Sequence, residues 1–279
     1  MDRRAWLQER RKYLGASEVA AVCGLCPFGS PLTVWASKCG ILTMQDSPAL
    51  QMGRLFETPL LAYYAAKNKR FLTQPGLRVK DWRCATPDAI ADSVRNVQVK
   101  VVGGRAAWKW DEGVPVYVLA QVQWEMFVTE LAITDVVACI GGTDYREHQV
   151  LRDDAAIADL DAICHEFWQR YVIGGEMPAP DASEEAKRIL AARWPQHIEA
   201  LQPAPDDVRA MAERYAEINK AVAAVEEEQA EIANRLRAAI GPGEGFTWDG
   251  GKVTWKTNKA GDRVLRVQIK ETTHGSRRS

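Results

Sequence analysis

The chain has 279 residues and a mass of 31.1 kDa, with 47% hydrophobic and 26% charged residues. This balance is that of a globular protein large enough for one big domain or two smaller ones. Its 36 Lys and Arg residues nearly match its 37 Asp and Glu residues, which excludes a globally basic, histone-like DNA binder. No apolar run approaches the ~18 residues that cross a bilayer, and the charged N-terminus is unlike a signal peptide. We therefore expect a cytoplasmic protein that is not bound to a membrane, with reduced cysteines.

The N-terminal part of the chain predicts helices. Residues 3–24 predict two short helices separated by a turn at Gly15 to Ser17, with Ser17 capping the second. Residues 26–31 form a loop, after which a third helix begins at Pro31 and ends at Gly40. A longer helix is expected over residues 49–67.

The pattern then changes to short β-branched runs separated by turn residues, which is typical of strands. The expected strands are 71–80, 82–92, 97–102, 133–142 and 146–152, with a hairpin turn at 93–96 and helices over 115–130 and 153–173. This order indicates a mixed α/β domain with one central sheet and helices on its faces.

A Gly/Pro-rich linker at 174–183 predicts a domain boundary. We expect domains over 1–175, 176–240 and 241–279. The middle one contains a long helix at 206–240, and the last is a basic β tail. Apolar residues along the long helix alternate at spacings of 3 and 4: Val208, Met211, Tyr215, Ile218, Val222, Val225, Ile232 and Leu236, with one polar break at Gln229. This heptad seam indicates packing against a helix of the same chain or of a symmetry mate.

The most informative polar residues lie on neighbouring strands. Asp88 follows Thr86 and Pro87, and Gln98-Val99-Lys100 follows ten residues later. Side chains alternate along a strand, so Gln98 and Lys100 share a face that Asp88 can reach across a hairpin. A carboxylate, a second oxygen ligand and an ammonium group would then converge, an arrangement that suits Mg²⁺.

Five ordered segments between residues 10 and 142 resemble the YqaJ-like viral recombinases and the phage lambda exonuclease family. They are LGASEVAAVCGL, GRLFE, ATPDAIAD, VQVK and AQVQWEMFVTE. The resemblance implies the PD-(D/E)XK nuclease fold and a Mg²⁺-dependent exonuclease that resects duplex DNA from 5′ to 3′. Mn²⁺ is an alternative cofactor, and one or two ions are expected. The resemblance also implies a phage or prophage origin, a trimeric homo-oligomer, and a single-strand annealing protein as partner.

The family's functional residues are carried over where the motifs match. The resemblance implies metal ligation by Asp88, Glu57, Gln98 and the backbone carbonyl of Val99, and catalysis with Lys100. It implies that Gln121 and Gln123 lie on the helix facing the site. Because residues two apart cannot share a helix face, we expect Gln123 to be the one at the site. Binding of DNA and of its 5′ phosphate is implied for Arg10, Ser17, Thr86, Arg105 and Gln121.

Two positions depart from the family pattern. Ala89 replaces a Gly, a mild change, whereas Gln98 replaces the Glu of the E-x-K motif. A carboxamide oxygen can still bind Mg²⁺ but carries no charge, so metal affinity should fall. The amide is compatible with an active natural variant, a degenerate enzyme or an engineered site.

Other features give alternatives. Trp108 and Trp110 flank Lys109 and can stack on unpaired bases or simply fill a core. The Cys23-x-x-Cys26 pair lacks a matching second pair, which favours buried thiols over a metal cluster. Rival functions are a catalytically impaired DNA-end-binding protein, a nicking or structure-specific endonuclease on the same fold, and a coiled-coil interaction protein.

Overall fold

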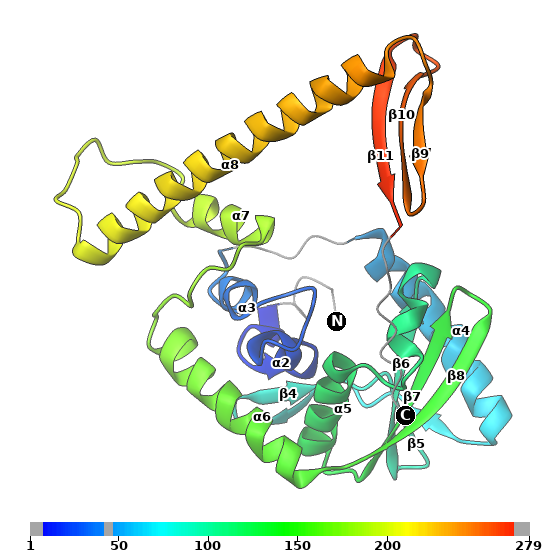
Figure 1. Ribbon diagram of the computed structural model, residues 1–279. Coiled ribbons are helices and arrows are strands. Elements are labelled where there is room, and N and C mark those ends of the chain that lie inside the picture. Colours follow the sequence, from blue (N-terminus) through cyan, green and yellow to red (C-terminus); the bar gives the residue numbers. More distant parts are fainter. Residues whose placement is uncertain (1–7, 42–46, 271–279) are drawn as a thin grey trace, which may run out of the picture. The chain divides into compact units, whose positions relative to one another are not determined.

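The structure of the chain is a computed structural model that describes residues 8–41 and 47–270. The chain divides into two compact units, Met1–His197 and Ile198–Ser279 (Figure 1). None of the described helices is both long and apolar enough to cross a membrane.

The first of the two short helices expected over 3–24 begins outside the described residues, and the helices of the first unit described from residue 16 on follow the predicted order. They are α2 (Ala16–Val22), α3 (Pro31–Lys38), α4 (Pro48–Asn68), α5 (Val116–Thr129), α6 (Asp154–Phe167) and α7 (Glu184–Arg193). Side-chain caps explain several starts, because Ser47 accepts from the Leu50 N–H and Asp153 accepts from the Ala155 N–H. The helix expected over 153–173 is confirmed in place, but its last turns, Trp168–Ile173, widen into a π-helix.

A five-stranded mixed sheet forms the centre of this unit. Its strands lie in the order β2 (Leu72–Thr73), β5 (Ala89–Ala91), β6 (Arg95–Val102), β7 (Ile133–Ile140) and β8 (Asp144–Leu151). Only β6 and β7 run parallel, and α5 makes the crossover between them. The mixed α/β architecture predicted from the sequence is confirmed.

Two predicted strands are each broken in two. The run 71–80 divides into β2 and β3 (Arg78–Lys80), and the run 82–92 divides into β4 (Arg83–Ala85) and β5. The breaks lie at Pro75 and Pro87, where proline cannot donate to a ladder. The separated pieces form a second small sheet, β1-β4-β3, in which β1 (Leu14–Gly15) replaces part of the expected turn.

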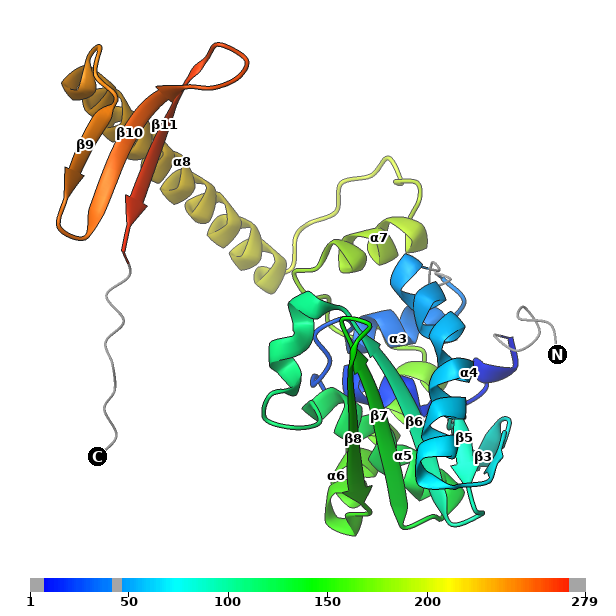
Figure 2. The same cartoon turned by 90° about the vertical axis from the view of Figure 1, so that its right-hand side faces the viewer.

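Helices cover both faces of the five-stranded sheet (Figure 2). On one face, Leu61 and Tyr64 of α4 pack against Val97 and Val99 of β6. On the other face, Val118 and Val122 of α5 pack with strand β7 and with Trp110 of the 3₁₀ helix η1 (Gly104–Trp110). Odd-numbered residues of β6 therefore face α4, and even-numbered ones face α5.

The first unit continues past residue 175, where we expected the nuclease domain to end. Ala186 and Ile189 of α7 are buried in the core that α2, α3, α5 and α6 share. Because these side chains complete that core, α7 belongs to the first unit.

The second unit contains α8 (Asp206–Ile240) and an antiparallel sheet of β9 (Gly245–Trp248), β10 (Gly251–Thr257) and β11 (Arg263–Ile269). Arg263 joins the helix end to the sheet. Its guanidinium lies 3.7 Å from the centre of the Trp255 ring and donates to the carbonyls of Gly241 and Gly243 at 2.9 and 2.7 Å. The long helix and the β tail predicted here are both present.

Candidate active site

Asp88 and Gln98 meet across the hairpin of β5 and β6, at the end away from its turn. The ladder pairs Ala89 with Val97, so one step further Asp88 lies opposite Gln98. Gln98 Nε2 donates to Asp88 Oδ2 at 2.7 Å, and the Val99 N–H donates to the same oxygen at 2.7 Å. The hairpin geometry expected from the alternation of side chains is therefore present.

Lys100 lies on the α5 side of β6 and is held by a chain of polar contacts. Its Nζ donates to Gln121 Oε1 at 2.7 Å, and Gln121 Nε2 donates to Glu125 Oε1 at 2.8 Å. Gln121 and Glu125 are one helical turn apart, so both reach the same side of α5. The amide of Gln121 thus fixes the direction of the lysine ammonium group.

Gln123 does not lie beside Lys100, so the expectation that it faces the site is wrong. Its Nε2 donates to the carbonyl of Leu151 at 2.8 Å, and its Oε1 accepts from the Asp153 N–H at 2.9 Å. These bonds join α5 to the end of β8 and the start of α6. Gln123 is a positioning residue of the core. Gln121 is the glutamine that lies at the site, where Gln123 was expected.

Burial dominates the electrostatics of the site. It raises the pKa of Asp88 to about 7, with a further rise from the nearby Glu57 of α4, while the Val99 N–H, Lys100 and Gln98 lower it. Burial also raises the pKa of Glu57 and lowers that of Lys100. Because Glu57 makes the ionisation of Asp88 more costly, a cation beside these two carboxyl groups would be favourable.

The residues present fit a divalent cation. Gln98 is 5% exposed, and its Oε1 is buried without a hydrogen-bond partner. An orphaned amide oxygen beside two carboxyl groups is an oxygen donor set of the kind that Mg²⁺ takes. Within the described residues no three His, Cys, Asp or Glu side chains gather to hold a metal. The amide oxygen and the Val99 carbonyl would therefore have to complete the site.

Arg10 and Ser17 come together before and at the start of α2. Arg10 Nη2 donates to Ser17 Oγ at 2.9 Å, and Ser17 is exposed. Gly15 makes this approach feasible, because a Cβ there would come within 2.4 Å of Arg10 Nη2. The structure thus brings these two side chains together, while their binding of a 5′ phosphate stays a prediction.

A buried ion pair holds this segment in place. Lys38, whose side chain is 1% exposed, lies 2.6 Å from Glu18 and donates to the carbonyls of Arg10 and Tyr13. Glu18 in turn accepts from the Gly15 N–H at 2.7 Å. The backbone around Arg10 is thus fixed by α3 as well as by α2.

The two tryptophans of η1 differ. Trp110 is 1% exposed and packs in the core between α5 and the sheet, so the expectation that it contacts DNA is wrong. Trp108 is 68% exposed, and Lys109 Nζ lies 5.6 Å from its ring centre and 5.0 Å from that of Phe28. Phe28 also makes an edge contact with Tyr117, one turn before Gln121 on α5. We name Phe28, Trp108 and Lys109 the aromatic rim.

Two other expected DNA contacts lie beside these groups in the chain. Arg105 is exposed in η1, directly after strand β6, which carries Gln98 and Lys100. Thr86 is half-buried between β4 and Asp88. Their contacts with DNA stay predictions.

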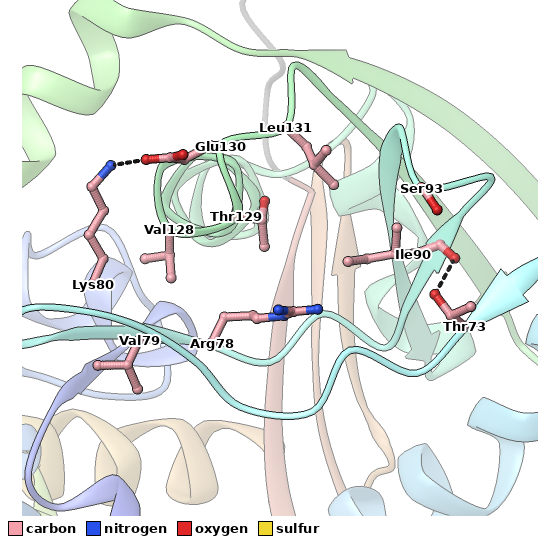
Figure 3. Close-up of a pocket in the computed structure, with 10 residues that line it drawn as sticks. All are labelled: Thr73, Arg78, Val79, Lys80, Ile90, Ser93, Val128, Thr129, Glu130 and Leu131. Atoms are coloured by element: carbon pink, nitrogen blue, oxygen red, sulfur yellow. Dashed lines mark hydrogen bonds and ion pairs between the residues drawn. The ribbon is translucent and has the colours of Figure 1, made fainter.

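A pocket of about 520 Å³ lies away from these residues, between β2, β3, β5 and the end of α5. Figure 3 shows Arg78 extending across it and Lys80 paired with Glu130, at 2.7 Å. Its wall combines Thr73 and Ile90 with these charges and contains none of the expected site residues. The chemistry expected from the sequence therefore lies on the inner strands β5 and β6 rather than in this pocket.

Sequence reasoning did not single out Glu125, Lys38, Glu18 or Phe28. Glu125 is 1% exposed, and burial raises its pKa to about 8. Its position four residues after Gln121 could have revealed it, since both lie on one helix face. The Lys38–Glu18 pair joins two helices across a loop, and no spacing rule in the sequence marks it.

Comparisons with known proteins show what the chain is similar to. Residues 5–132 match the family model described as YqaJ-like viral recombinase domain. The chain is 25% identical over 304 residues to the uncharacterized protein YqaJ of Bacillus subtilis (strain 168), covering 98% of this chain and 92% of that relative.

Solved structures share the fold. The alkaline exonuclease LHK-Exo from Laribacter hongkongensis matches with a TM-score of 0.53 and 21% identity, covering 68% of this chain and 100% of that one. A protein from Eubacterium rectale, named as a candidate exonuclease, matches with a TM-score of 0.52 and 12% identity over 74% of this chain and 95% of that one. The first unit therefore has the PD-(D/E)XK fold of phage-type exonucleases, as the sequence predicted.

Proposed function

On the basis of the YqaJ-like viral recombinase domain that residues 5–132 carry, we propose that the chain is a Mg²⁺-dependent DNA exonuclease. It digests linear duplex from 5′ ends and leaves 3′ single strands for recombination by a single-strand annealing protein. The observation that carries the proposal is the convergence of Asp88, the unpartnered oxygen of Gln98 and the Lys100 ammonium on the neighbouring strands β5 and β6.

Asp88, Glu57, Gln98 Oε1 and the Val99 carbonyl would hold one or two Mg²⁺ ions, or Mn²⁺ in their place. Bound there, the ion lowers the pKa of the attacking water and stabilises charge on the leaving oxygen. Lys100 donates to the scissile phosphate or to the water. Burial lowers its pKa, so it gives up a proton more readily than an exposed lysine does. Gln121 accepts a hydrogen bond from the Lys100 Nζ and so holds this ammonium group at the site.

Arg10 and Ser17 are suited to a 5′ phosphate, because a guanidinium and a hydroxyl 2.9 Å apart can both donate to phosphate oxygens. Arg105 and Thr86 would add contacts to the DNA backbone or to the terminal phosphate. Together these groups would seat the end of the 5′ strand, so that the bond next to it is the one cut.

The aromatic rim would contact the unpaired strand. Phe28 and Trp108 offer exposed ring faces, and Lys109 supplies a positive charge between them. Bases stack on such rings regardless of sequence. We also expect a trimeric nuclease, as the resemblance implies, that acts in the cytoplasm of a bacterial host.

The test uses linear duplex labelled at either the 5′ or the 3′ end, with and without a 5′ phosphate. We expect Mg²⁺-dependent release of 5′-end nucleotides, faster on phosphorylated ends and absent on closed circular DNA. Asp88→Asn should abolish release without unfolding the protein. Release from 3′ ends, cutting of closed circles, or an active Asp88→Asn variant would contradict the proposal.

The amide at Gln98 supports a second candidate, a DNA-end-binding protein that does not cut. The amide of Gln98 lacks the negative charge that a carboxylate would give the metal site. Binding of phosphorylated ends without nucleotide release at any Mg²⁺ or Mn²⁺ concentration would favour this candidate. Nucleotide release that appears only in Gln98→Glu would do the same.

A further inference from the structure

Helix α8, 35 residues long, carries an apolar seam that the described residues of its own unit leave uncovered from Val208 to Ile232. The seam residues Val208, Met211, Tyr215, Ile218, Val222, Val225 and Ile232 are between 44% and 68% exposed. A seam with alternating spacings of 3 and 4 is the pattern that packs against one other helix. The proposed nuclease chemistry makes no use of it.

Charges beside the seam select the partner helix. Every seventh residue of the seam, from Val208 to Leu236, is preceded by a flanking residue. These flanking residues are Asp207, Arg214, Ala221, Glu228 and Arg235. They read acid, base, neutral, acid, base. On a second α8 helix that runs in the opposite direction the series is reversed, so a basic residue lies opposite each acidic one and the reverse.

We propose that α8 pairs antiparallel with α8 of a second copy of this chain, centred on Ala221. In that alignment Arg214 lies opposite Glu228 of the second copy, and Asp207 opposite Arg235. Each pair occurs twice because the two copies are related by a two-fold axis. These flanking positions face each other in an antiparallel pair of helices.

A parallel pair has no such complementarity. There, each flanking residue meets the residue five positions later on the other helix. Arg214 would meet Asn219, Ala221 would meet Glu226, and Glu228 would meet Ala233, so no opposite charges would meet. The charge pattern therefore favours the antiparallel arrangement.

The seam also fits. Centring the pair in this way packs Val208 against Ile232, Tyr215 against Val225 and Ile218 against Val222 of the other copy. Gln229, the polar break, meets Met211, whose flexible side chain adapts to it. In a parallel pair Gln229 would instead meet its own copy in the core.

Existing contacts leave the flanking charges available. Arg214 pairs with Glu217 at 3.0 Å and Arg235 with Glu231 at 3.6 Å, both within the helix and on exposed side chains. Such exposed pairs contribute little, so the guanidinium groups can turn to a second helix. On the other side of the seam, the positions just after Met211, Ile218, Val225 and Ile232 contain a single charged residue, Glu226.

The test measures the mass of the full chain by sedimentation equilibrium across a concentration series. Ile218→Asp places a charge at the centre of the seam and should halve the measured mass. The change is from two copies to one, or from six copies to three if the nuclease unit forms the expected trimer, because three α8 helices cannot all pair two by two within one trimer. Arg214→Glu and Glu228→Arg, each alone, should weaken pairing about tenfold, because two attractive pairs become repulsive. The double variant should restore pairing. Glu227→Arg, on the outer face, is the matched control and should leave the mass unchanged.

Each other outcome overturns the proposal. If Ile218→Asp has the same mass as the parent, the seam does not join two copies of the chain. Any self-association is then elsewhere, and the seam binds the chain's own nuclease unit or another protein. Single charge reversals without effect, or a double variant that fails to restore pairing, exclude the antiparallel alignment. Helicity by circular dichroism verifies that α8 still forms in each variant. Cleavage of linear duplex DNA is measured separately in each variant. Failure of helix pairing can then be distinguished from failure of the proposed nuclease function.

Discussion

Replacing Gln98 with Glu tests the metal site through stability as well as activity. In the parent, Gln98 Nε2 donates to Asp88 Oδ2 at 2.7 Å, which ties two buried groups together. Gln98→Glu removes this charge-assisted bond, worth about 1.5–3 kcal/mol. It also sets two carboxyl groups side by side. At a pH above the value of about 7 to which burial raises the pKa of Asp88, where both can be ionised, their repulsion at an effective dielectric constant near 20 reaches about 4 kcal/mol at ~4 Å.

Since water entry and local relaxation offset part of this repulsion, we expect a net loss of about 3 kcal/mol in the free energy of unfolding without divalent ions. That corresponds to a fall in Tm of about 6–12 °C for a unit of this size. Mg²⁺ should restore most of it, because the cation replaces the lost donor between the carboxylates. The same variant should need less Mg²⁺ for half-maximal DNA cleavage.

The assay is thermal unfolding in EDTA and in a Mg²⁺ series, for the parent and two variants. Gln123→Glu is the matched control, because it loses the donor to the Leu151 carbonyl in the core but lies away from the proposed metal. It should be destabilised equally with and without Mg²⁺. If Gln98→Glu shows no loss in EDTA, or if Mg²⁺ raises the Tm of both variants equally, Gln98 does not contact a bound cation.

Three further outcomes are expected. Arg10→Ala should remove the preference for 5′-phosphorylated over 5′-hydroxyl ends in a cleavage-rate comparison, and a preference that persists would exclude Arg10 from the phosphate site. Glu125 has its pKa raised to about 8 by burial, above its unfolded value, so the folded state binds the extra proton and stability falls as pH rises from about 4.5 towards 8. Glu125→Gln should flatten that fall in Tm measured from pH 5 to 8, and equal slopes in the two proteins would contradict the assignment. Trp108→Ala should weaken single-strand binding in fluorescence anisotropy with little change in Tm, whereas Trp110→Ala should cost about 3–5 kcal/mol of stability. The reverse pattern would show that Trp108 is structural.

Local patterns predicted much of this protein. The period of 3.6 located α4, α5 and α8, and the β-branched runs located β6 and β7. The meeting of Asp88 with Gln98 followed from two local rules, the alternation of side chains and the register of a short hairpin. A pair set by neighbouring strands needs no knowledge of the rest of the fold.

Other features depended on tertiary packing. Gln121 and Gln123 are two residues apart on α5, and only the placement of that helix over the sheet decided that Gln121 meets Lys100. Trp108 and Trp110 likewise differ only in which of them turns inward from η1. Local sequence gives a helix its faces but does not determine how the helix is rotated against its neighbours.

The same holds for the segment that carries Arg10. Its position depends on Lys38, which reaches from α3 to Glu18 and to two backbone carbonyls. A buried ion pair is stabilising only when both partners and their hydrogen bonds are brought together by the whole fold. The sequence by itself therefore determined the elements and the strand-borne part of the site. Contacts between helices distant in sequence decided which of the candidate side chains reach it.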